Sequence, residues 1–302
     1  MPTRRDGVEA GSRPLGEAED AGAGLSQPGT DRPRARKRFG QHFLVPDWAA
    51  KVANAIAPTP ADTIIEIGPG PGAITSLLTA RARSVAAIEI DRDMVARLNA
   101  DRPDNLRIVE GDVLDVSAAQ VQQTLEELGA ASHAVRVAGN LPYNVASPIL
   151  FKLLELRDAG VPIVDATVML QREVAARLLA APGTKEYGVL TVLIGHRCDV
   201  IRLLNLPPGA FRPPPKVNST VVRLTFHEPM PPVRSDATFH SVVQAVFTRR
   251  RKTLANALLA HPAAASAGPA QLLQSAGIDG RRRPETLTIA EFAHLANTLA
   301  PA

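Results

Sequence analysis

The sequence predicts an α/β fold, in which a parallel sheet is covered by helices on both faces and a smaller helical domain follows it. Two patterns support this prediction. Short apolar, β-branched runs alternate with helix-patterned segments between residues 48 and 180, as in parallel sheets buried on both sides. After residue 236 the apolar spacing is helical, and Gly and Pro interrupt it at intervals.

The predicted elements alternate in order along the chain. Each predicted strand is a short run rich in Val, Ile and Ala, and each predicted helix carries apolar side chains three or four residues apart. Pro58 and Pro60 stop the first helix. The predicted strands are Thr63–Ile67, Val85–Ile90, Leu106–Val109, Val135–Ala138, Ala166–Leu170, Val189–Ile194 and Thr220–Phe226. The predicted helices of the same region are Trp48–Ala57, Ala73–Ala80, Met94–Ala100, Val121–Leu128, Ile149–Leu156 and Arg172–Ala180.

The composition changes at both ends of this region. Residues 1–30 hold almost no large apolar side chains, so they bury too little surface to offset the entropy of ordering. We therefore predict a disordered tail over residues 1–33 and an α/β domain over residues 34–230. Met230-Pro231-Pro232 marks the end of that domain, and residues 231–302 are predicted to form a helical C-terminal domain.

The composition also excludes several classes of protein. The chain has 302 residues and a single cysteine, Cys198, so it can form neither an intramolecular disulfide nor a cluster of thiolate ligands. No apolar run approaches the ~20 residues of a membrane span, and no apolar stretch follows Met1–Arg5 as a secretory signal would require. The histidines show no metal-ligand spacing. We expect a cytoplasmic protein without a metal site.

Positive charge is concentrated in the last third of the chain. The net charge of the whole chain is +4, whereas residues 205–302 hold 11 basic and 5 acidic side chains. A second basic cluster lies between Arg32 and Arg38. Such asymmetry suggests a polyanionic partner, although charge alone favours a solvated surface.

A glycine-rich turn, Glu66–Ala73, follows the first predicted strand and precedes a helix. Glycines such as Gly68 and Gly70 let the backbone approach a ligand where a side chain would collide. The spacing also fits the dinucleotide fingerprint G-x-G-x-x-A. A pyrophosphate needs free backbone N–H donors, however, and Pro69 and Pro71 have none. The turn therefore favours a ligand without phosphate, and S-adenosylmethionine is such a nucleoside.

Acidic residues recur where successive strands end. Glu89 lies 23 residues after Glu66, and Asp112 lies another 23 residues on. At the second strand an acid can accept hydrogen bonds from both ribose hydroxyls, and Asp112 is placed to accept one from an adenine amino group. Each acid alone is more often a helix N-cap or a solvated loop residue. Because they occur in register, we predict that they bind a nucleoside.

Asn140-Leu141-Pro142-Tyr143 follows the fourth predicted strand. An exocyclic aromatic amine is a poor nucleophile, because its lone pair is delocalised into the ring. Two acceptors for its hydrogens, the Asn140 side-chain oxygen and the Leu141 carbonyl, would localise that pair, while Pro142 stiffens the turn. Tyr143 offers a flat face for an extruded base. The segment therefore predicts methyl transfer to such an amine; a plain turn is the alternative.

Together these motifs resemble class I S-adenosylmethionine-dependent methyltransferases, with a Rossmann-like sheet, that act on the amino nitrogen of adenine. Further segments narrow the resemblance to the ribosomal RNA adenine dimethyltransferase family, in particular its small-subunit, kasugamycin-resistance branch. Those segments are Phe39–Leu44, Asn140–Asn144, Met169–Glu173, Tyr187-Gly188 and Phe211–Ser219. The resemblance covers roughly residues 34–302.

The resemblance implies S-adenosylmethionine as donor and N6,N6-dimethyladenosine at two adjacent positions of a small-subunit (16S) rRNA hairpin near the 3′ end. It further implies a pre-30S particle as partner, a role in small-subunit biogenesis and no membrane; a monomer is the default. His42 occupies a position that is more often Asn in the family, but imidazole can still donate or accept one hydrogen bond. The implied donor-binding residues are His42, Leu44, Gly68, Gly70, Glu89, Asp112, Val113 and Asn140.

Several further residues are candidates for contact with RNA. Phe39, His42 and Phe43 could clamp RNA or fold over the donor as a lid, and the family favours the lid. Phe211 and Lys216 lie in a proline-rich segment that we expect to line the base-entry groove, with Phe211 as a second stacking surface. We place Arg249, Arg250, Arg251 and Lys252 on a helix that continues to Leu259 and expect them to contact RNA phosphates. For Arg281, Arg282 and Arg283, phosphate contact and plain surface are equally supported.

Three alternatives remain open at this point. The first is the related large-subunit adenine methyltransferase of the macrolide-resistance type, which shares fold and chemistry. The second is a small-subunit assembly factor in which catalysis is secondary. The third is an NAD-dependent enzyme, which the two turn prolines and the Asn140–Tyr143 segment disfavour.

Overall fold

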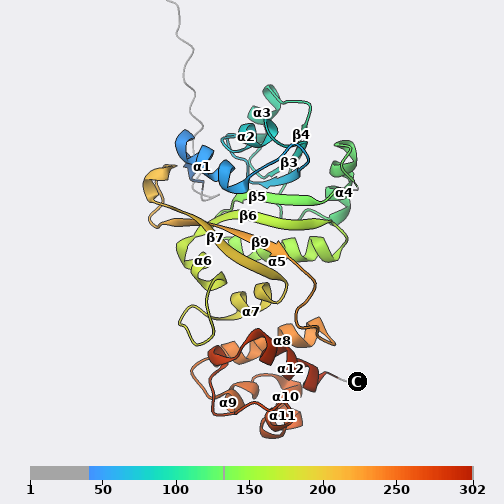
Figure 1. The fold of residues 1–302 in the computed structure, drawn as a ribbon, viewed down its shortest axis with the longest axis vertical. Helices are drawn as coiled ribbons and strands as arrows, with labels where there is room; N and C mark the ends of the chain where they lie inside the picture. The colour runs from blue at the N-terminus through green and yellow to red at the C-terminus, as the bar shows by residue number, and fades with distance from the viewer. Residues whose placement is uncertain (1–40, 132, 301–302) are drawn as a thin grey trace, which may run out of the picture. The chain divides into compact units, whose positions relative to one another are not determined.

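The computed structural model describes residues 41–131 and 133–300 (Figure 1). The predicted tail, residues 1–33, lies outside the described residues. The strands are β1 (Phe43–Leu44), β2 (Thr63–Ile67), β3 (Ser84–Glu89), β4 (Leu106–Glu110), β5 (Val135–Asn140), β6 (Ile163–Gln171), β7 (Cys198–Leu206), β8 (Phe211–Arg212) and β9 (Ser219–Phe226). The α-helices are α1 (Pro46–Ile56), α2 (Thr75–Thr79), α3 (Arg92–Ala100), α4 (Ala118–Glu127), α5 (Ala146–Asp158), α6 (Arg172–Leu178), α7 (Val189–Gly195), α8 (Asp236–Thr248), α9 (Leu254–Leu258), α10 (Pro262–Ala267), α11 (Pro269–Ser275) and α12 (Ile289–Leu299). Short 3₁₀ helices cover Pro208–Ala210 and Pro284–Thr286.

Seven strands form one sheet in the order β4-β3-β2-β5-β6-β9-β7. The five strands from β4 to β6 are parallel, and β9 is antiparallel to both β6 and β7. The chain leaves β2 toward β3 on one side and leaves β5 toward β6 on the other, so β2 and β5 flank a topological switch point. In open α/β sheets, ligands bind outside the carboxyl ends of the strands at such a point.

Both faces of the sheet are buried, as the apolar strands predict. In β2, Ile64 packs with α1 and α2 on one face, whereas Ile65 and Ile67 pack with α4 and α5 on the other. Figure 1 shows α1, α2 and α3 on one side of the sheet and α5 on the opposite side. Ile64 is fully buried, and burial of such a side chain contributes roughly 1.5–3 kcal/mol. The predicted order of strands and helices from β2 to α6 is confirmed.

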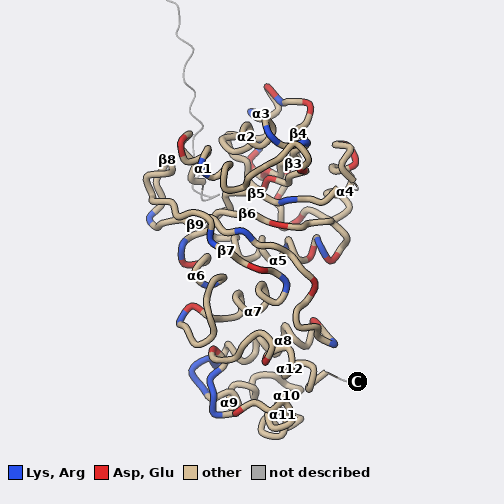
Figure 2. The backbone as a smooth tube through the Cα atoms, viewed as in Figure 1, with Lys and Arg blue, Asp and Glu red and all other residues tan. Residues whose placement is uncertain are grey.

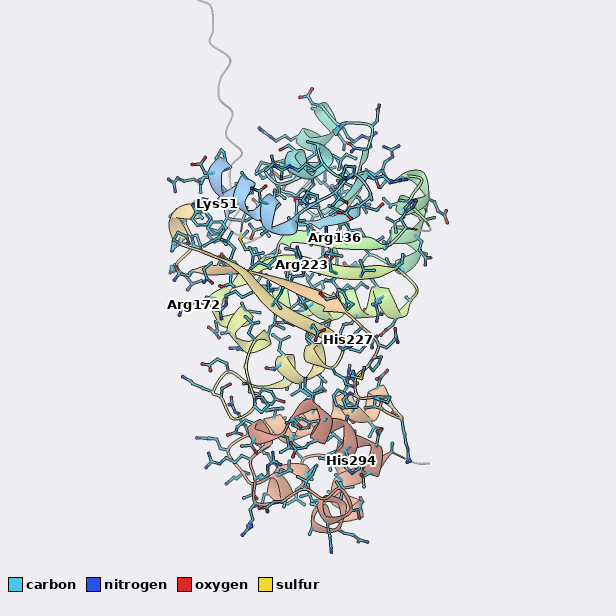
Figure 3. All side chains as sticks on the ribbon, in the orientation of Figure 1. Lys51, Arg136, Arg172, Arg223, His227 and His294 are labelled. Atoms are coloured by element: carbon cyan, nitrogen blue, oxygen red, sulfur yellow. The ribbon has the colours of Figure 1, made fainter. Side chains whose placement is uncertain are left out.

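Two arginines of the sheet hold the end of α1 (Figure 3). Arg136 in β5 donates to the carbonyls of Ile56 and Ala57 and pairs with Asp62 and Asp165. Arg223 in β9 donates to the carbonyls of Ala55 and Ile56. Cations at a helix C-terminus donate hydrogen bonds to its free carbonyls and interact favourably with the negative end of its dipole. Because β1 directly precedes α1, this anchor also helps to place residues 42–44.

The predicted strand Val189–Ile194 is wrong, since this segment is helix α7, and the strand that pairs with β9 is β7, further along the chain. A short apolar run does not distinguish a buried helix from a buried strand. The helix is favoured here because its side chains are buried in two directions. Val192 and Leu193 pack with α8 and α12, and Ile194 packs with the sheet.

The C-terminal helices α8 to α12 share one apolar core, which contains Phe239 and Phe292, and α7 contributes to the same core. The predicted domain boundary between residues 230 and 231 stays a prediction. Helix α7 precedes this boundary but shares the core of the helices that follow it. The helix predicted to carry Arg249–Lys252 is wrong: α8 ends at Thr248, and the four cations lie in the turn before α9.

Candidate active site at the carboxyl end of the sheet

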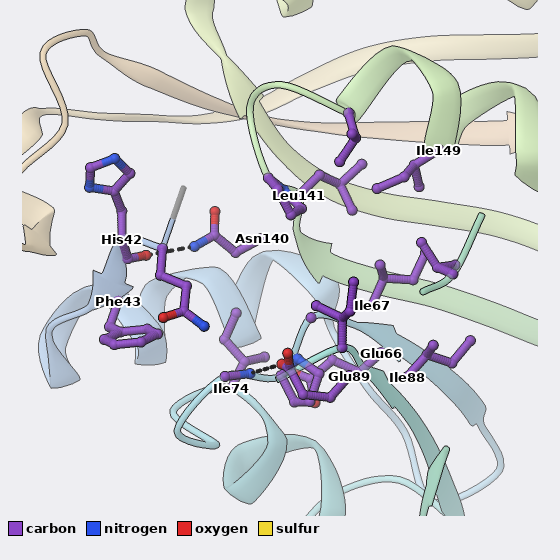
Figure 4. A pocket seen from close by; sticks show the side chains of 18 of the residues that line it. His42, Phe43, Glu66, Ile67, Ile74, Ile88, Glu89, Asn140, Leu141 and Ile149 are labelled. Carbon is purple, nitrogen blue, oxygen red and sulfur yellow. Dashed lines mark hydrogen bonds between the residues drawn. The ribbon is translucent and has the colours of Figure 1, made fainter. Parts of the chain in front are cut away.

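A cavity of about 300 Å³ lies at the carboxyl ends of β2, β3, β4 and β5 (Figure 4). Its volume is at the lower end of the range of small-molecule sites. Every residue predicted to bind the donor or to hold the reacting amine lines it. These residues are His42, Leu44, Gly68, Gly70, Glu89, Asp112, Val113, Asn140, Leu141, Pro142 and Tyr143. Their individual roles remain predictions.

The glycine turn adopts a backbone that other residues rarely adopt. Gly68, Gly70 and Gly72 have φ of +67°, +55° and +88°. A Cβ on Gly70 would lie 3.2 Å from the Phe43 ring, so β1 packs directly on the turn. The N–H groups of the three glycines are all engaged, with Ile88 O, Glu89 Oε2 and Pro69 O respectively. The turn therefore offers none of these three donors to a phosphate.

Glu89, the last residue of β3, holds the glycine turn through its carboxylate. Its two carboxylate oxygens accept hydrogen bonds from the Gly70 and Asp91 N–H groups, each at 2.9 Å. Burial raises the pKa of Glu89, and these two hydrogen bonds oppose that effect. A carboxylate has about four lone-pair positions, so Glu89 retains acceptor capacity for ligand hydroxyls.

Glu66 is a residue of this site to which sequence reasoning assigned no role of its own. It lies in the apolar strand β2, is 1% exposed, and lines the cavity. Its Oε2 atom has no hydrogen-bond partner among the described residues. Burial, and to a smaller degree the charge of Glu89, raises the pKa of Glu66 to about 7. An acid in the middle of an apolar strand is the sequence signal that could have identified it.

Asp112 lies in the turn after β4. Its Oδ1 accepts a hydrogen bond from the Leu114 N–H at 3.0 Å, which holds the carboxylate at the cavity. The neighbouring Val113 is buried and presents an apolar side chain to the same wall. An acceptor beside an apolar surface suits the edge and face of a purine.

Asn140 lies at the end of β5, opposite the glycine turn (Figure 4). Its side-chain nitrogen donates to the His42 carbonyl at 2.9 Å. A carbonyl only accepts, so this bond fixes the orientation of the amide and leaves Oδ1 as the acceptor for a ligand. The next residue, Leu141, is tied to β6 through its N–H and the Met169 carbonyl.

Tyr143 is half-buried and is held from two directions. Its ring stacks with that of His42, at a centroid separation of 5.6 Å and an interplanar angle of 26°. Its hydroxyl lies 2.7 Å from the Ser219 hydroxyl. His42 Nδ1 in turn lies 2.8 Å from the Pro213 carbonyl oxygen. The sequence offered no way to pair Tyr143 with Ser219, because 76 residues separate them.

The RNA contacts predicted in the proline-rich segment and before α9 lie outside the cavity, and one of them is wrong. Phe211 is fully buried in the core beside Leu44, so it has no exposed face on which a base could stack. Lys216 is exposed. In the turn before α9, Arg249, Arg251 and Lys252 are exposed, and Figure 2 shows the cations gathered there. Arg250 is half-buried and donates to the carbonyls of Thr184 and Lys185.

Within residues 41–131 and 133–300, no group of three His, Cys, Asp or Glu side chains is placed to hold a metal ion. None of the helices in the described part of the chain is long and apolar enough to cross a membrane.

Comparison with known proteins identifies the family. A family model described as ribosomal RNA adenine dimethylase matches residues 32–301. A protein of Acinetobacter baylyi named "Ribosomal RNA small subunit methyltransferase A" is 42% identical over 275 residues, which cover 89% of this chain and 93% of that protein. This chain belongs to the ribosomal RNA adenine dimethylase family. A protein of the same name from Aromatoleum aromaticum is 42% identical over 88% of this chain and 95% of its own length.

Solved structures agree with this family. A dimethyladenosine transferase from Plasmodium falciparum has a TM-score of 0.68 and 25% identity, over 84% of this chain and 96% of that one. The 23S rRNA methyltransferase ErmE has a TM-score of 0.57 and 25% identity, over 85% of this chain and 99% of that one. The predicted fold and the predicted class of enzyme, a ribosomal RNA adenine dimethyltransferase, are confirmed. Membership of this family excludes the NAD-dependent alternative.

Proposed function

We propose that this dimethyltransferase moves methyl groups from S-adenosylmethionine to N6 of two adjacent adenosines in a 16S rRNA hairpin near the 3′ end, giving N6,N6-dimethyladenosine. Relatives that share 42% identity carry names of small-subunit enzymes. One observation carries the proposal above the others. The oriented oxygen of Asn140 opens on the same cavity as the glycine turn and Glu89, so donor and target amine share one site.

The cavity fits S-adenosylmethionine better than a nucleotide. Its glycine turn has prolines and engaged N–H groups where a phosphate would need donors. Glu89 and Asp112 would accept from the ribose hydroxyls and the adenine amino group. Glu66, whose Oε2 has no partner within residues 41–131 and 133–300, gives the cavity an acidic group for the cationic part of the donor. When bound, the donor supplies an electrophilic methyl group on a sulfonium sulfur.

The Asn140–Tyr143 segment activates the target amine. Asn140 Oδ1 and the Leu141 carbonyl accept its two hydrogens, which favours a pyramidal nitrogen with a localised lone pair. Tyr143 stacks on the extruded base and holds its plane. The nitrogen–methyl bond forms as the methyl–sulfur bond breaks, and the nitrogen then loses a proton, so no strong general base is required. Orientation carries much of the rate, as is usual when two reactants are held in one cavity.

The C-terminal helices supply the second part of the proposal. Arg249, Arg251, Lys252 and the exposed Lys216 would contact RNA phosphates, while Arg250 holds its loop in place. We place the enzyme in the cytoplasm, acting as a monomer on a pre-30S particle and away from membranes. Residues 34–230 would form the catalytic domain and residues 231–302 the RNA-binding domain.

Transfer of labelled methyl groups tests this function. The substrates are unmethylated small subunits, unmethylated large subunits and naked RNA, followed by mapping of the modified bases. Dimethyladenosine confined to small-subunit RNA is the expected result. Labelling of large-subunit RNA would favour the alternative function, a large-subunit adenine methyltransferase. The TM-score of 0.57 with the 23S rRNA methyltransferase is the observation that supports this alternative. Tight binding to small subunits without transfer would favour an assembly factor.

A further inference from the structure

The hydroxyls of Tyr143 and Ser219 form a close pair beside the active site. Their oxygens are 2.7 Å apart, Ser219 is fully buried, and Tyr143 is half-buried. This bond is not part of a secondary structure, since it joins the turn after β5 to the first residue of β9. A buried hydroxyl pair of this kind stabilises the fold when it is made, and leaving one partner unpaired costs more than the bond contributes.

Ser219 is the more firmly held of the two residues. It pairs with Gln171 of β6 on one side and with Leu206 of β7 on the other. The residue before it, Asn218, accepts a hydrogen bond from the Arg172 N–H through its carbonyl. Ser219 is therefore a fixed point of the sheet, whereas Tyr143 lies in a turn.

We propose that Ser219 is a positioning residue for methyl transfer: its hydroxyl fixes the tilt of the Tyr143 ring, and hence the plane on which the target adenine stacks. The proposal rests on the function proposed above. A tyrosine ring attached at Cβ and held at its hydroxyl keeps the direction of its long axis, and the stacked His42 ring limits rotation about that axis. Among the described residues the His42 side chain has one hydrogen bond, to the Pro213 carbonyl, and that bond is exposed, so the His42 ring is held less firmly than Ser219.

The two methylations place different demands on this plane. Before the first transfer the amine has two hydrogens, so either rotamer presents one to Asn140. Before the second transfer it has one hydrogen and one methyl group, so one of the two acceptors, Asn140 Oδ1 or the Leu141 carbonyl, must face the methyl group and only one hydrogen bond holds the amine. A displacement of about 1 Å is enough to cost a reaction on the order of 100-fold in rate. A tilting Tyr143 ring should therefore slow the second transfer more than the first, and monomethyladenosine should accumulate.

A double-mutant cycle tests the proposal. The variants are Ser219→Ala, Tyr143→Phe and the double variant, each assayed on small subunits for transfer rate and for the ratio of mono- to dimethyladenosine. We expect a loss of about tenfold in the second transfer for each single variant, and no further loss in the double variant. Donor affinity should stay within twofold of that of the unmodified protein.

Thr220→Val is the matched control, because it removes the hydroxyl of the next residue. Thr220 is also buried, and its hydroxyl donates to Asn205 rather than to Tyr143. We expect its product ratio to equal that of the unmodified protein.

Each outcome decides the proposal. Normal rate and product ratio in Ser219→Ala, or losses that add in the double variant, would overturn it. If Ser219→Ala does not fold, Tyr143→Phe removes the same hydrogen bond from the half-buried side, and a normal product ratio in that variant would also overturn the proposal. No transfer by the unmodified protein would contradict the proposed function instead.

Discussion

The side-chain nitrogen of Asn140 donates a hydrogen bond to the backbone carbonyl of His42 at 2.9 Å, across 98 residues of sequence. This bond joins the segment that closes one side of the cavity to the turn that would hold the target amine. It also determines which atom of the amide faces a ligand. Orientation of Asn140 thus depends on correct placement of residues 42–44, which α1 and its arginine anchor help to secure.

Asn140→Ala and Asn140→Asp should both abolish most transfer. The alanine variant removes the acceptor, whereas the aspartate variant keeps an oxygen acceptor but sets a carboxylate against the His42 carbonyl. We expect transfer to fall by about 100-fold or more in each, the loss typical of one oriented polar group at a reacting centre. Affinity for small subunits, measured in parallel, should change by less than twofold. Equal losses in transfer and in affinity would contradict the role of Asn140.

Glu89→Gln should weaken binding of S-adenosylmethionine. An amide has one acceptor oxygen, so it cannot accept from both Gly70 and Asp91 as Glu89 does. We expect a rise of about tenfold in the donor Kd by calorimetry, which corresponds to about 1.4 kcal/mol. Glu110→Gln is the control, because Glu110 ends the neighbouring strand β4 but its carboxylate pairs with the exposed Arg92. A donor Kd unchanged by Glu89→Gln would contradict this account of the turn.

Glu66→Gln should alter the pH dependence of stability in the donor-free protein. The pKa of Glu66 is raised by burial from 4.5 to about 7, so ionisation costs the folded state free energy. The contribution of neutral Glu66 to the free energy of unfolding is complete below pH 4.5. It is lost as the pH rises through 7, and the loss is up to about 3 kcal/mol. Urea unfolding should show Glu66→Gln gaining on the unmodified protein between pH 5 and pH 8. A difference that does not vary with pH, as expected for the exposed control Glu126→Gln, would refute the prediction.

The exposed cations before α9 should determine how RNA affinity responds to salt. Replacing Arg249 and Arg251 by Ala should weaken binding to small subunits. It should also reduce the slope of log binding constant against log salt concentration by about 1 to 2. Arg83→Ala with Arg102→Ala removes the same charge from exposed positions beside β3 and β4. This control should leave the slope closer to that of the unmodified protein. An unchanged slope in the first variant would remove the turn from the interface.

The sequence was sufficient where a residue's role depends on its position along a strand. Glu89, Asp112 and Asn140 each follow an apolar run, and parallel strands bring their ends together, so their meeting in one cavity was predictable. It was insufficient where burial depends on distant contacts. Phe211 looked like a stacking surface beside prolines, but the β1–β8 pairing turns it into the core.

Helix α7 and the Ser219–Tyr143 pair show the same limit. The apolar run of residues 189–194 is compatible with either a buried strand or a buried helix. Its packing against α8 favours the helix. Ser219 meets Tyr143 only because β9 inserts between β6 and β7. A turn of four cations was predicted as helix because Leu254 and Leu258 beyond it keep a helical spacing, although α9 begins anew at Leu254.

Dimethylation by the Asn140 site is tested best by the nucleoside composition of small-subunit RNA after complete reaction with this protein and S-adenosylmethionine. Mass spectrometry of digested RNA, with mapping of the modified positions, counts methyl groups on each adenosine. We expect N6,N6-dimethyladenosine at two adjacent positions with the unmodified protein, and none with Asn140→Ala. Dimethyladenosine formed equally well by Asn140→Ala, or methylation confined to large-subunit RNA, would contradict this expectation.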